Sequence, residues 1–100
     1  MLMSDFEDSK FNEIISKGVV LIDFYATWCG PCKMLQPELE ELVKRNKDIV
    51  ICKVDVDKHS ELSRSYGIMS VPTLMLYKDG SLVKKMAGYM PVDALMEWIG

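Results

Sequence analysis

The fold of this chain is decided by residues 19–32, VVLIDFYATWCGPC. Residues 19–25 form a nearly continuous apolar run, which is typical of a strand buried on both faces of a sheet. A helical pattern follows directly, and Pro31 suits its first turn. Its apolar face is made by Leu35, Leu39, Leu42 and Val43. Cys29 and Cys32 are therefore predicted to stand where a buried strand gives way to a helix.

Helix and strand patterns alternate on both sides of this junction. Helical spacing precedes Gly18 and returns at residues 62–66 and 92–99, whereas residues 49–56, 73–77 and 82–86 read as strands. Asp79-Gly80 is a strong hairpin turn signal between the last two strands. A first strand in residues 1–3 is barely visible. This order predicts an α/β fold with a central mixed sheet of four to five strands and helices on both faces.

Length and composition narrow the class of protein. A chain of 100 residues suits a single domain spanning residues 1–100, and an apolar fraction of 49% is ordinary for a soluble globular protein. The net charge of −3 argues against nucleic acid or an anionic membrane surface as a partner. No stretch approaches the ~20 apolar residues of a membrane span. Residues 1–8 lack the features of a secretory signal, and three cysteines make a poor disulfide framework, so a cytoplasmic protein is predicted.

The position of the two cysteines gives them unequal chemistry. A thiolate at a helix N-terminus is stabilised by unpaired backbone N–H groups and by the helix dipole. Cys29, at the open end of the turn, is predicted to be the nucleophile. Cys32 lies one turn further in, close enough to attack a mixed disulfide on Cys29. Gly30 and Pro31 suit the spacer, because they give a tight turn and then a preset helical φ.

A zinc site is the competing interpretation, since half of such a site also has two cysteines at this spacing. Cys52 and His59 could complete a set of four ligands. However, Cys52 falls inside an apolar strand pattern, where core packing is the simpler role, and His59 lies in a polar segment. The strand-to-helix context favours a redox pair, and we predict no metal and a redox-silent Cys52.

Asp23 is a carboxylate within the apolar strand pattern, where burial should raise its pKa toward the range useful for proton transfer. Lys53, in the next predicted parallel strand, is its natural partner. Two interpretations stay open: a structural aspartate that pairs with a lysine or caps a neighbouring turn, or a residue that exchanges the proton of Cys32. Further along the chain, Pro72 marks the start of a strand or a special peptide bond.

Taken together, these motifs resemble the thioredoxin family. The resemblance runs from about residue 6 to residue 99 and rests on several motifs in order. They are Asp23-Phe24, Trp28-Cys29-Gly30-Pro31-Cys32-Lys33, Pro37, Lys53, Asp55, Val71-Pro72-Thr73 and Gly88. The resemblance implies the thioredoxin fold and a thiol–disulfide oxidoreductase that reduces protein disulfides, is re-reduced by a thioredoxin reductase, and needs no cofactor beyond its own cysteines.

The resemblance also implies roles for individual residues. Cys29 would attack, Cys32 would resolve, and Asp23 would be the buried acid–base residue with Lys53 beside it. Pro72 would be a cis-proline against the cysteines. The docking surface for a client protein would be formed by Trp28, Gly30, Pro31, Val71, Pro72, Ala87 and Gly88. The protein would act as a monomer on disulfide-containing clients.

Two further expectations concern the direction and the class of the function. The Gly-Pro spacer carries no cation that would make the disulfide more oxidising, so it favours a reductant. A non-catalytic interaction module that uses the same apolar surface is the alternative of a different class. Tyr25 and Met69-Ser70 depart from the residues frequent in the family, which bears on the choice of client rather than on the reaction.

Overall fold

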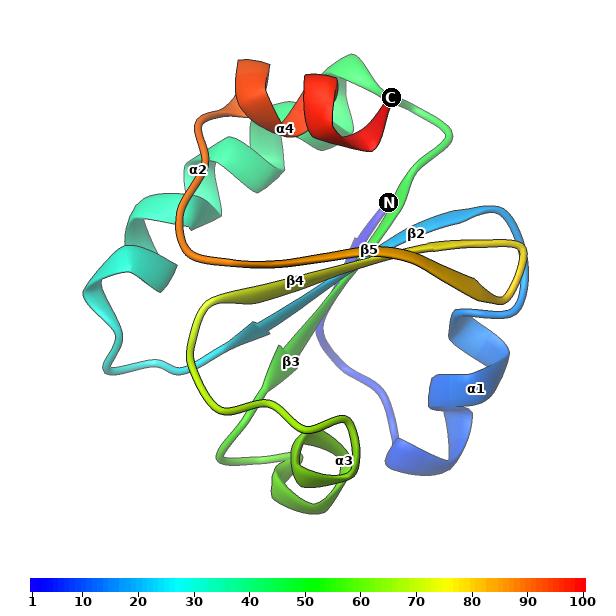
Figure 1. Cartoon of the computed structure of the whole chain (residues 1–100), viewed down its shortest axis with the longest axis vertical. Helices are drawn as coiled ribbons and strands as arrows, with labels where there is room; N and C mark the ends of the chain where they lie inside the picture. Colours follow the sequence, from blue (N-terminus) through cyan, green and yellow to red (C-terminus); the bar gives the residue numbers. More distant parts are fainter.

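A five-stranded mixed sheet runs through the middle of the molecule in the order β1-β3-β2-β4-β5 (Figure 1). The structure is a computed structural model that describes residues 1–100. β1 (Leu2–Met3) and β2 (Val19–Tyr25) each pair in parallel with β3 (Val50–Asp55). β4 (Thr73–Lys78) is antiparallel to β2, and β5 (Ser81–Ala87) is antiparallel to β4. The mixed sheet predicted from the sequence is confirmed, with five strands.

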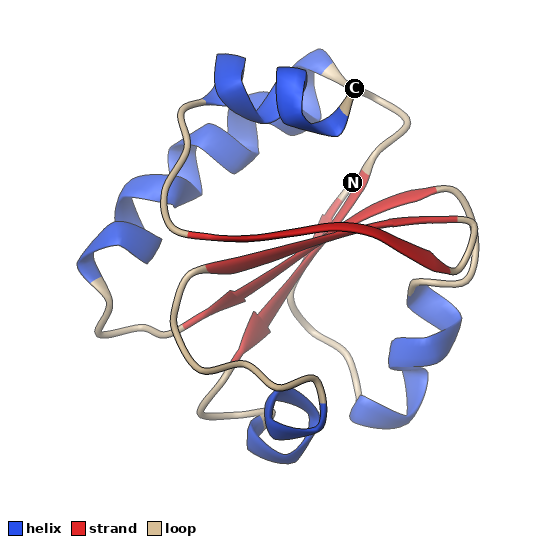
Figure 2. Ribbon diagram, in the orientation of Figure 1, coloured by secondary structure: helices blue, strands red, loops and turns tan.

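Helices cover both faces of this sheet, as predicted (Figure 2). On one side lie α2 (Gly30–Arg45) and α4 (Val92–Ile99), which share a core with Leu21, Leu74 and Leu76. On the other side lie the 3₁₀ helix η1 (Asp8–Lys10), α1 (Phe11–Ile14) and α3 (Ser60–Ser65). No helix has the length and apolar character needed to cross a membrane.

Strand β2 is buried along its five central residues and sets the position of Asp23. Side chains alternate between the two faces of a strand. Ile22 and Phe24 belong to the core on the α1 and α3 side, whereas Leu21 belongs to the core under α2 and α4. Asp23 shares the face of Leu21, so its carboxyl group lies in the layer between the sheet and α2.

The β4–β5 hairpin turns at the residues that the sequence indicated. Asp79 has φ 49° and Gly80 has φ 87°, the two positive values that a tight hairpin turn requires. The Asp79 carboxylate also accepts a hydrogen bond from the backbone N–H of Gly18 at 2.8 Å. This contact ties the hairpin to the loop that enters β2.

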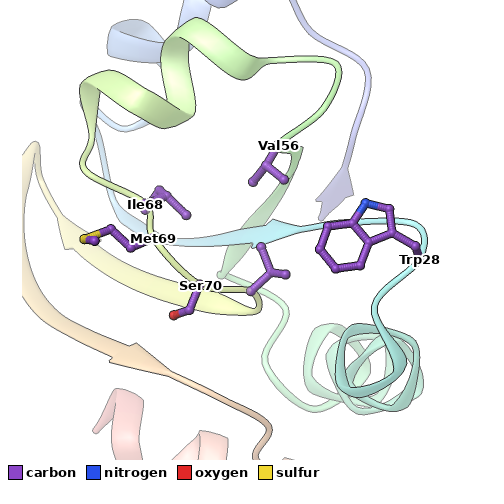
Figure 3. A pocket seen from close by; sticks show the side chains of 6 residues that line it. Trp28, Val56, Ile68, Met69 and Ser70 are labelled. Carbon is purple, nitrogen blue, oxygen red and sulfur yellow. The ribbon is translucent and has the colours of Figure 1, made fainter.

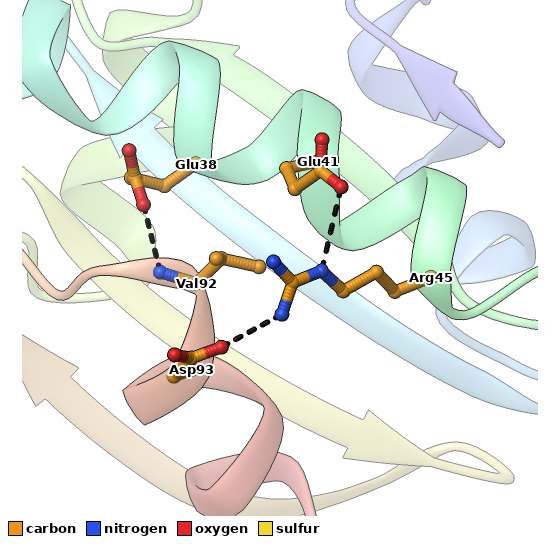
Figure 4. A network of polar contacts seen from close by, with 5 residues as sticks. All are labelled: Glu38, Glu41, Arg45, Val92 and Asp93. Carbon is orange, nitrogen blue, oxygen red and sulfur yellow. Dashed lines mark hydrogen bonds and ion pairs between the residues drawn. The ribbon is translucent and has the colours of Figure 1, made fainter.

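Polar contacts fix α4 against α2 (Figure 4). Pro91 stands at the N-cap of α4, and its side chain makes no capping hydrogen bond. Instead, Glu38 of α2 accepts a hydrogen bond from the backbone N–H of Val92 at 2.8 Å. Arg45 reaches from the end of α2 to Glu41 at 3.3 Å and to Asp93 at 2.7 Å. Because a helix N-terminus carries unpaired N–H groups and positive partial charge, Glu38 and Asp93 both suit this position.

Candidate active site

Cys29 and Cys32 lie where the loop after β2 enters α2, as predicted. Cys29 is the N-cap of α2 with an extended backbone, φ −91° and ψ 117°. Its sulfur accepts a hydrogen bond from the backbone N–H of Cys32 at 3.2 Å. Both thiols are free, so the structure shows the reduced pair. The helix therefore presents an amide donor to the sulfur of Cys29, which stabilises negative charge there.

The two thiols have different surroundings. Burial, together with a hydrogen bond to Cys29, raises the pKa of the Cys32 thiol to about 12. The sulfur of Cys29 lies 3.7 Å from the carbonyl oxygen of Val71, which belongs to the loop that leads into β4. Cys32 thus keeps its proton at neutral pH until a base removes it. A base is needed close by.

Asp23 lies in the buried layer beneath α2 and has the properties of such a base. Its side chain is 1% exposed, and neither carboxylate oxygen has a hydrogen-bond partner. Burial raises its pKa from 3.8 to about 7, although the positive charge of Lys53 opposes this rise. The negative charge of Asp23 in turn contributes to the raised pKa of Cys32. A group that titrates near neutrality can accept a proton and return it.

Lys53 lies beside Asp23 but does not pair with it. The two residues are direct partners in the parallel ladder between β2 and β3. The Lys53 ammonium instead donates a hydrogen bond to Oε1 of Gln36 and lies 4.1 Å from the centroid of the Tyr25 ring. The interpretation of Asp23 as one half of an ion pair is therefore wrong, because both of its oxygens lack a partner.

The backbone around Pro72 forms the opposite wall of the site. The Val71–Pro72 peptide bond is cis, as the family resemblance implied. The backbone N–H of Gly88 donates to the Pro72 carbonyl at 2.9 Å, and Ala87 pairs with Thr73 in the β4–β5 ladder. These contacts bring the end of β5 next to the proline. Gly30 and Pro31, on the first turn of α2, are exposed.

An open groove of about 420 Å³ begins at Trp28 and runs along the loop that follows α3 (Figure 3). Its lining residues are Trp28, Val56, Ile68, Met69, Ser70 and Val71. Trp28 and Val71 were expected on a docking surface. Val56, Ile68, Met69 and Ser70 were not assigned to it from the sequence. Ile68, Met69 and Ser70 directly precede Val71-Pro72, and the sequence marked Met69-Ser70 only as a departure from the family that bears on the choice of client. Val56 directly follows β3.

The alternative zinc set does not come together, because Cys52 and His59 do not join the pair Cys29 and Cys32. Cys52 packs in the core on the α1 and α3 side of the sheet, and burial raises its pKa to about 12. His59 stacks on Phe6, with ring centroids 4.4 Å apart, and its Nδ1 hydrogen-bonds to Asp8. The structure gathers no group of three or more His, Cys, Asp or Glu side chains suited to a metal ion. The structure thus gives no support to the zinc interpretation.

The fold and this site together define a class of protein. Two free thiols at a helix N-terminus, above a buried carboxyl group, form a site for thiol–disulfide exchange. Comparison with known proteins narrows the class to one family. Residues 3–100 match the thioredoxin family model. The chain belongs to the thioredoxin family.

Relatives from bacteria and eukaryotes match along almost the whole chain. Thioredoxin of Bacillus subtilis is 48% identical over 93 residues, covering 92% of this chain and 89% of the relative. Thioredoxin of Listeria monocytogenes is 44% identical over 99 residues, covering 98% and 96%. Members of this family are thiol–disulfide oxidoreductases that act through a redox-active cysteine pair of their own, and Cys29 and Cys32 are that pair here.

Solved structures agree with this assignment. Oxidised thioredoxin of Plasmodium falciparum aligns with a TM-score of 0.87 at 40% identity, covering 99% of this chain and 95% of that one. Oxidised mitochondrial thioredoxin 3 of Saccharomyces cerevisiae aligns with a TM-score of 0.88 at 37% identity, covering 98% and 92%. Family membership implies disulfide substrates and a thioredoxin reductase.

Proposed function

We propose that this protein reduces disulfide bonds in client proteins, with Cys29 as the attacking thiolate and Cys32 as the resolving thiol. The observation that carries the proposal is the asymmetry of the pair. The Cys29 sulfur receives the backbone amide of Cys32 at 3.2 Å, whereas the Cys32 thiol is held protonated by burial. The Cys29 sulfur is thus suited to attack first, and the Cys32 thiol becomes reactive only after it has lost its proton.

A client segment docks in extended conformation across the surface next to Cys29. The groove formed by Trp28, Val56, Ile68, Met69, Ser70 and Val71 offers it apolar side chains. The rest of the docking surface is supplied by Gly30, Pro31, Ala87 and Gly88, together with Pro72, which is itself buried. The backbone of Val71 offers strand-like hydrogen bonds, because this segment precedes β4 and joins no neighbouring strand. Docking here brings the client disulfide to the Cys29 sulfur.

In the first step the Cys29 thiolate attacks one sulfur of the client disulfide. A bond forms between Cys29 and that sulfur, the client S–S bond breaks, and the other client sulfur leaves as a thiolate that takes a proton from solvent. The product is a mixed disulfide. One client sulfur is now a free thiol, and the other is bound to Cys29.

In the second step Cys32 releases the client. The Asp23 carboxylate takes the proton of the Cys32 thiol, since its pKa of about 7 suits it to act as a base near neutrality. The Cys32 thiolate then attacks the Cys29 sulfur, the Cys29–Cys32 bond forms and the mixed disulfide bond breaks. The second client sulfur leaves as a thiolate and takes a proton, from Asp23 or from solvent. Two electrons have passed from the dithiol to the client. Lys53 lies beside Asp23, and its positive charge lowers the pKa of the Asp23 carboxyl group.

A thioredoxin reductase then reduces the Cys29–Cys32 disulfide back to the dithiol with two electrons. The spacer residues Gly30 and Pro31 place no cation near the sulfurs, which favours a reductant over an oxidant. The same proposal takes residues 1–100 as one domain that acts as a monomer in the cytoplasm, with no metal or further cofactor. A reducing compartment agrees with the cysteine count of three, which is a poor basis for a disulfide framework.

Reduction of insulin, as a model protein disulfide, tests the proposal with a small dithiol as electron donor. The unmodified chain should accelerate insulin reduction far above the rate with the dithiol alone. The double variant Cys29→Ser/Cys32→Ser should add nothing, and Cys52→Ala should keep its turnover. Insulin reduction that survives the double serine change would refute the proposal. A cellular role that survives it would instead support the interaction module.

A further inference from the structure

Gln36 is a residue that the reaction as described does not use, although it lies at the centre of the polar contacts above Asp23. It sits on α2, one turn after Cys32, and is partly buried. Its Oε1 accepts the hydrogen bond of the Lys53 ammonium, and its Nε2 donates to Oε2 of Glu40 at 3.0 Å. The second contact fixes which way the amide faces, so that its oxygen is turned toward Lys53.

The position of Lys53 needs an explanation. Lys53 and Asp23 are direct partners on neighbouring parallel strands, so their side chains leave the same face of the sheet. A buried carboxylate with no partner attracts a nearby ammonium strongly. Yet Lys53 binds Gln36 and lies over the Tyr25 ring at 4.1 Å, and both Asp23 oxygens stay unpaired. Something must compete with the carboxylate for this ammonium.

We propose that Gln36 is a positioning residue that holds the Lys53 ammonium away from the Asp23 carboxylate and thereby keeps Asp23 a proton acceptor near neutral pH. The inference rests on the proposed role of Asp23 in the second step. The hydrogen bonds of Gln36 go to Glu40 and Lys53 and not to a sulfur, so it acts through Lys53. Without it, Lys53 pairs with Asp23, and a carboxylate stabilised in this way is a weaker base.

The charges that face Asp23 are few, which makes the effect of Lys53 measurable. Lys53 on β3 is the cation that lowers the pKa of Asp23. Cys32 on α2 and Tyr25 on β2 are the ionisable groups that feel its negative charge. On β4 its partner is Leu74, which does not titrate. Movement of one ammonium is therefore the main change that a Gln36 variant can cause.

The test follows the carboxyl carbon of Asp23 by NMR while the pH is varied, in the whole labelled chain. Gln36→Met removes the acceptor but keeps the length of the side chain, and its titration midpoint should fall by about one pH unit. Gln36→Glu keeps an acceptor for Lys53 and should leave the midpoint at or above that of the unmodified protein. A repeat on the oxidised protein, where neither thiol ionises, assigns the change to the carboxyl group.

A double variant separates positioning from a structural role. In a Lys53→Met background, Gln36→Met should no longer move the Asp23 midpoint, because the ammonium is gone. A midpoint that Gln36→Met leaves unchanged, or one that it still lowers in the Lys53→Met background, would overturn the inference.

The rate of mixed-disulfide resolution, measured against pH, separates this inference from the proposed function. Its profile should move toward acid by the same amount as the Asp23 titration in Gln36→Met. A titration that moves while the resolution profile stays in place supports the positioning of Lys53, and it counts against proton transfer to Asp23.

Discussion

The indole nitrogen of Trp28 donates a hydrogen bond to the carboxylate of Asp57 at 3.0 Å. The Trp28 side chain is nonetheless 69% exposed, so this bond holds a large apolar surface in place while leaving it open to solvent. Asp57 lies just after β3, and its neighbour Asp55 accepts the Asp57 backbone N–H at 2.9 Å. An aromatic ring fixed before docking loses less entropy when a client binds.

Asp57→Ala should therefore weaken docking without affecting the chemistry. Loss of one hydrogen bond, worth about 1 kcal/mol, corresponds to a KM for insulin roughly fivefold higher. Reduction of a small aromatic disulfide, which needs no docking surface, should keep its rate. Asp48→Ala removes an exposed carboxylate at the opposite end of β3 and serves as the control. Equal effects of the two substitutions on KM would show that Trp28 needs no support from Asp57.

Asp23→Asn should slow the second step of the reaction more than the first. The carboxylate is proposed to take the Cys32 proton, and asparagine cannot do so. Stopped-flow measurement of both steps should show resolution slower by about tenfold or more, with water as the weaker base, and mixed-disulfide formation changed by less than about twofold. Equal slowing of both steps would mean that the substitution disturbs the site as a whole.

The stability of the protein should also depend on pH through Asp23. Its pKa is about 7 in the folded chain against an ordinary value of 3.8, so the folded state binds the proton more tightly than the unfolded state. The penalty of burying the charged form is absent below pH 4 and grows as the pH rises toward 7. At about 1.4 kcal/mol per pH unit, this penalty is on the order of 4 kcal/mol above pH 7.

Urea unfolding of the unmodified chain and of Asp23→Asn at several pH values measures this penalty. The free energy of unfolding of the variant, relative to the unmodified chain, should increase between pH 4 and pH 7 and level off above it. The other titrating groups are common to both chains, and the two that feel the Asp23 charge, Cys32 and Tyr25, do not titrate in this pH range. A difference that stays constant over this range would mean that the Asp23 carboxyl group titrates normally.

Much of the fold could be predicted because its signals are local. The apolar run of β2, the turn at Asp79-Gly80 and the helical spacing after Pro91 each act over fewer than ten residues. β1 was barely visible, because it has only two residues and depends on distant partners. It pairs with β3, and the Met1 amino group donates to the Ile49 carbonyl at 2.7 Å.

The site could be predicted in part for the same reason. The cysteine pair, Asp23 and the Val71-Pro72 segment are recognisable as motifs, and the structure brings them together. The true contacts of Lys53 could not be predicted, because the Gln36 amide reaches it only once α2 has packed on the sheet. The docking surface predicted from the sequence was incomplete as well. Val56 and Ile68 meet only through the packing of β3 and the loop after α3.

Glu38 should stabilise α4 although it belongs to α2. Its carboxylate accepts the Val92 N–H at 2.8 Å at the start of α4. Glu38→Ala leaves that N–H unpaired, and we expect a loss of about 1 kcal/mol in the free energy of unfolding, as for the loss of a helix cap. Glu38→Gln retains an oxygen acceptor and should lose less than half as much. If Glu38→Ala unfolds at the same urea concentration as the unmodified chain, the hydrogen bond contributes nothing to stability.

Trapping of a mixed disulfide tests most directly the claim that Cys29 attacks and Cys32 resolves. Cys32→Ser, mixed with an excess of a disulfide-containing protein, should form a stable one-to-one adduct, and peptide mass mapping should place the linkage on Cys29. Cys29→Ser should form no comparable adduct under the same conditions. An adduct that forms readily on Cys32 in the Cys29→Ser chain, or on Cys52 in either chain, would contradict the account.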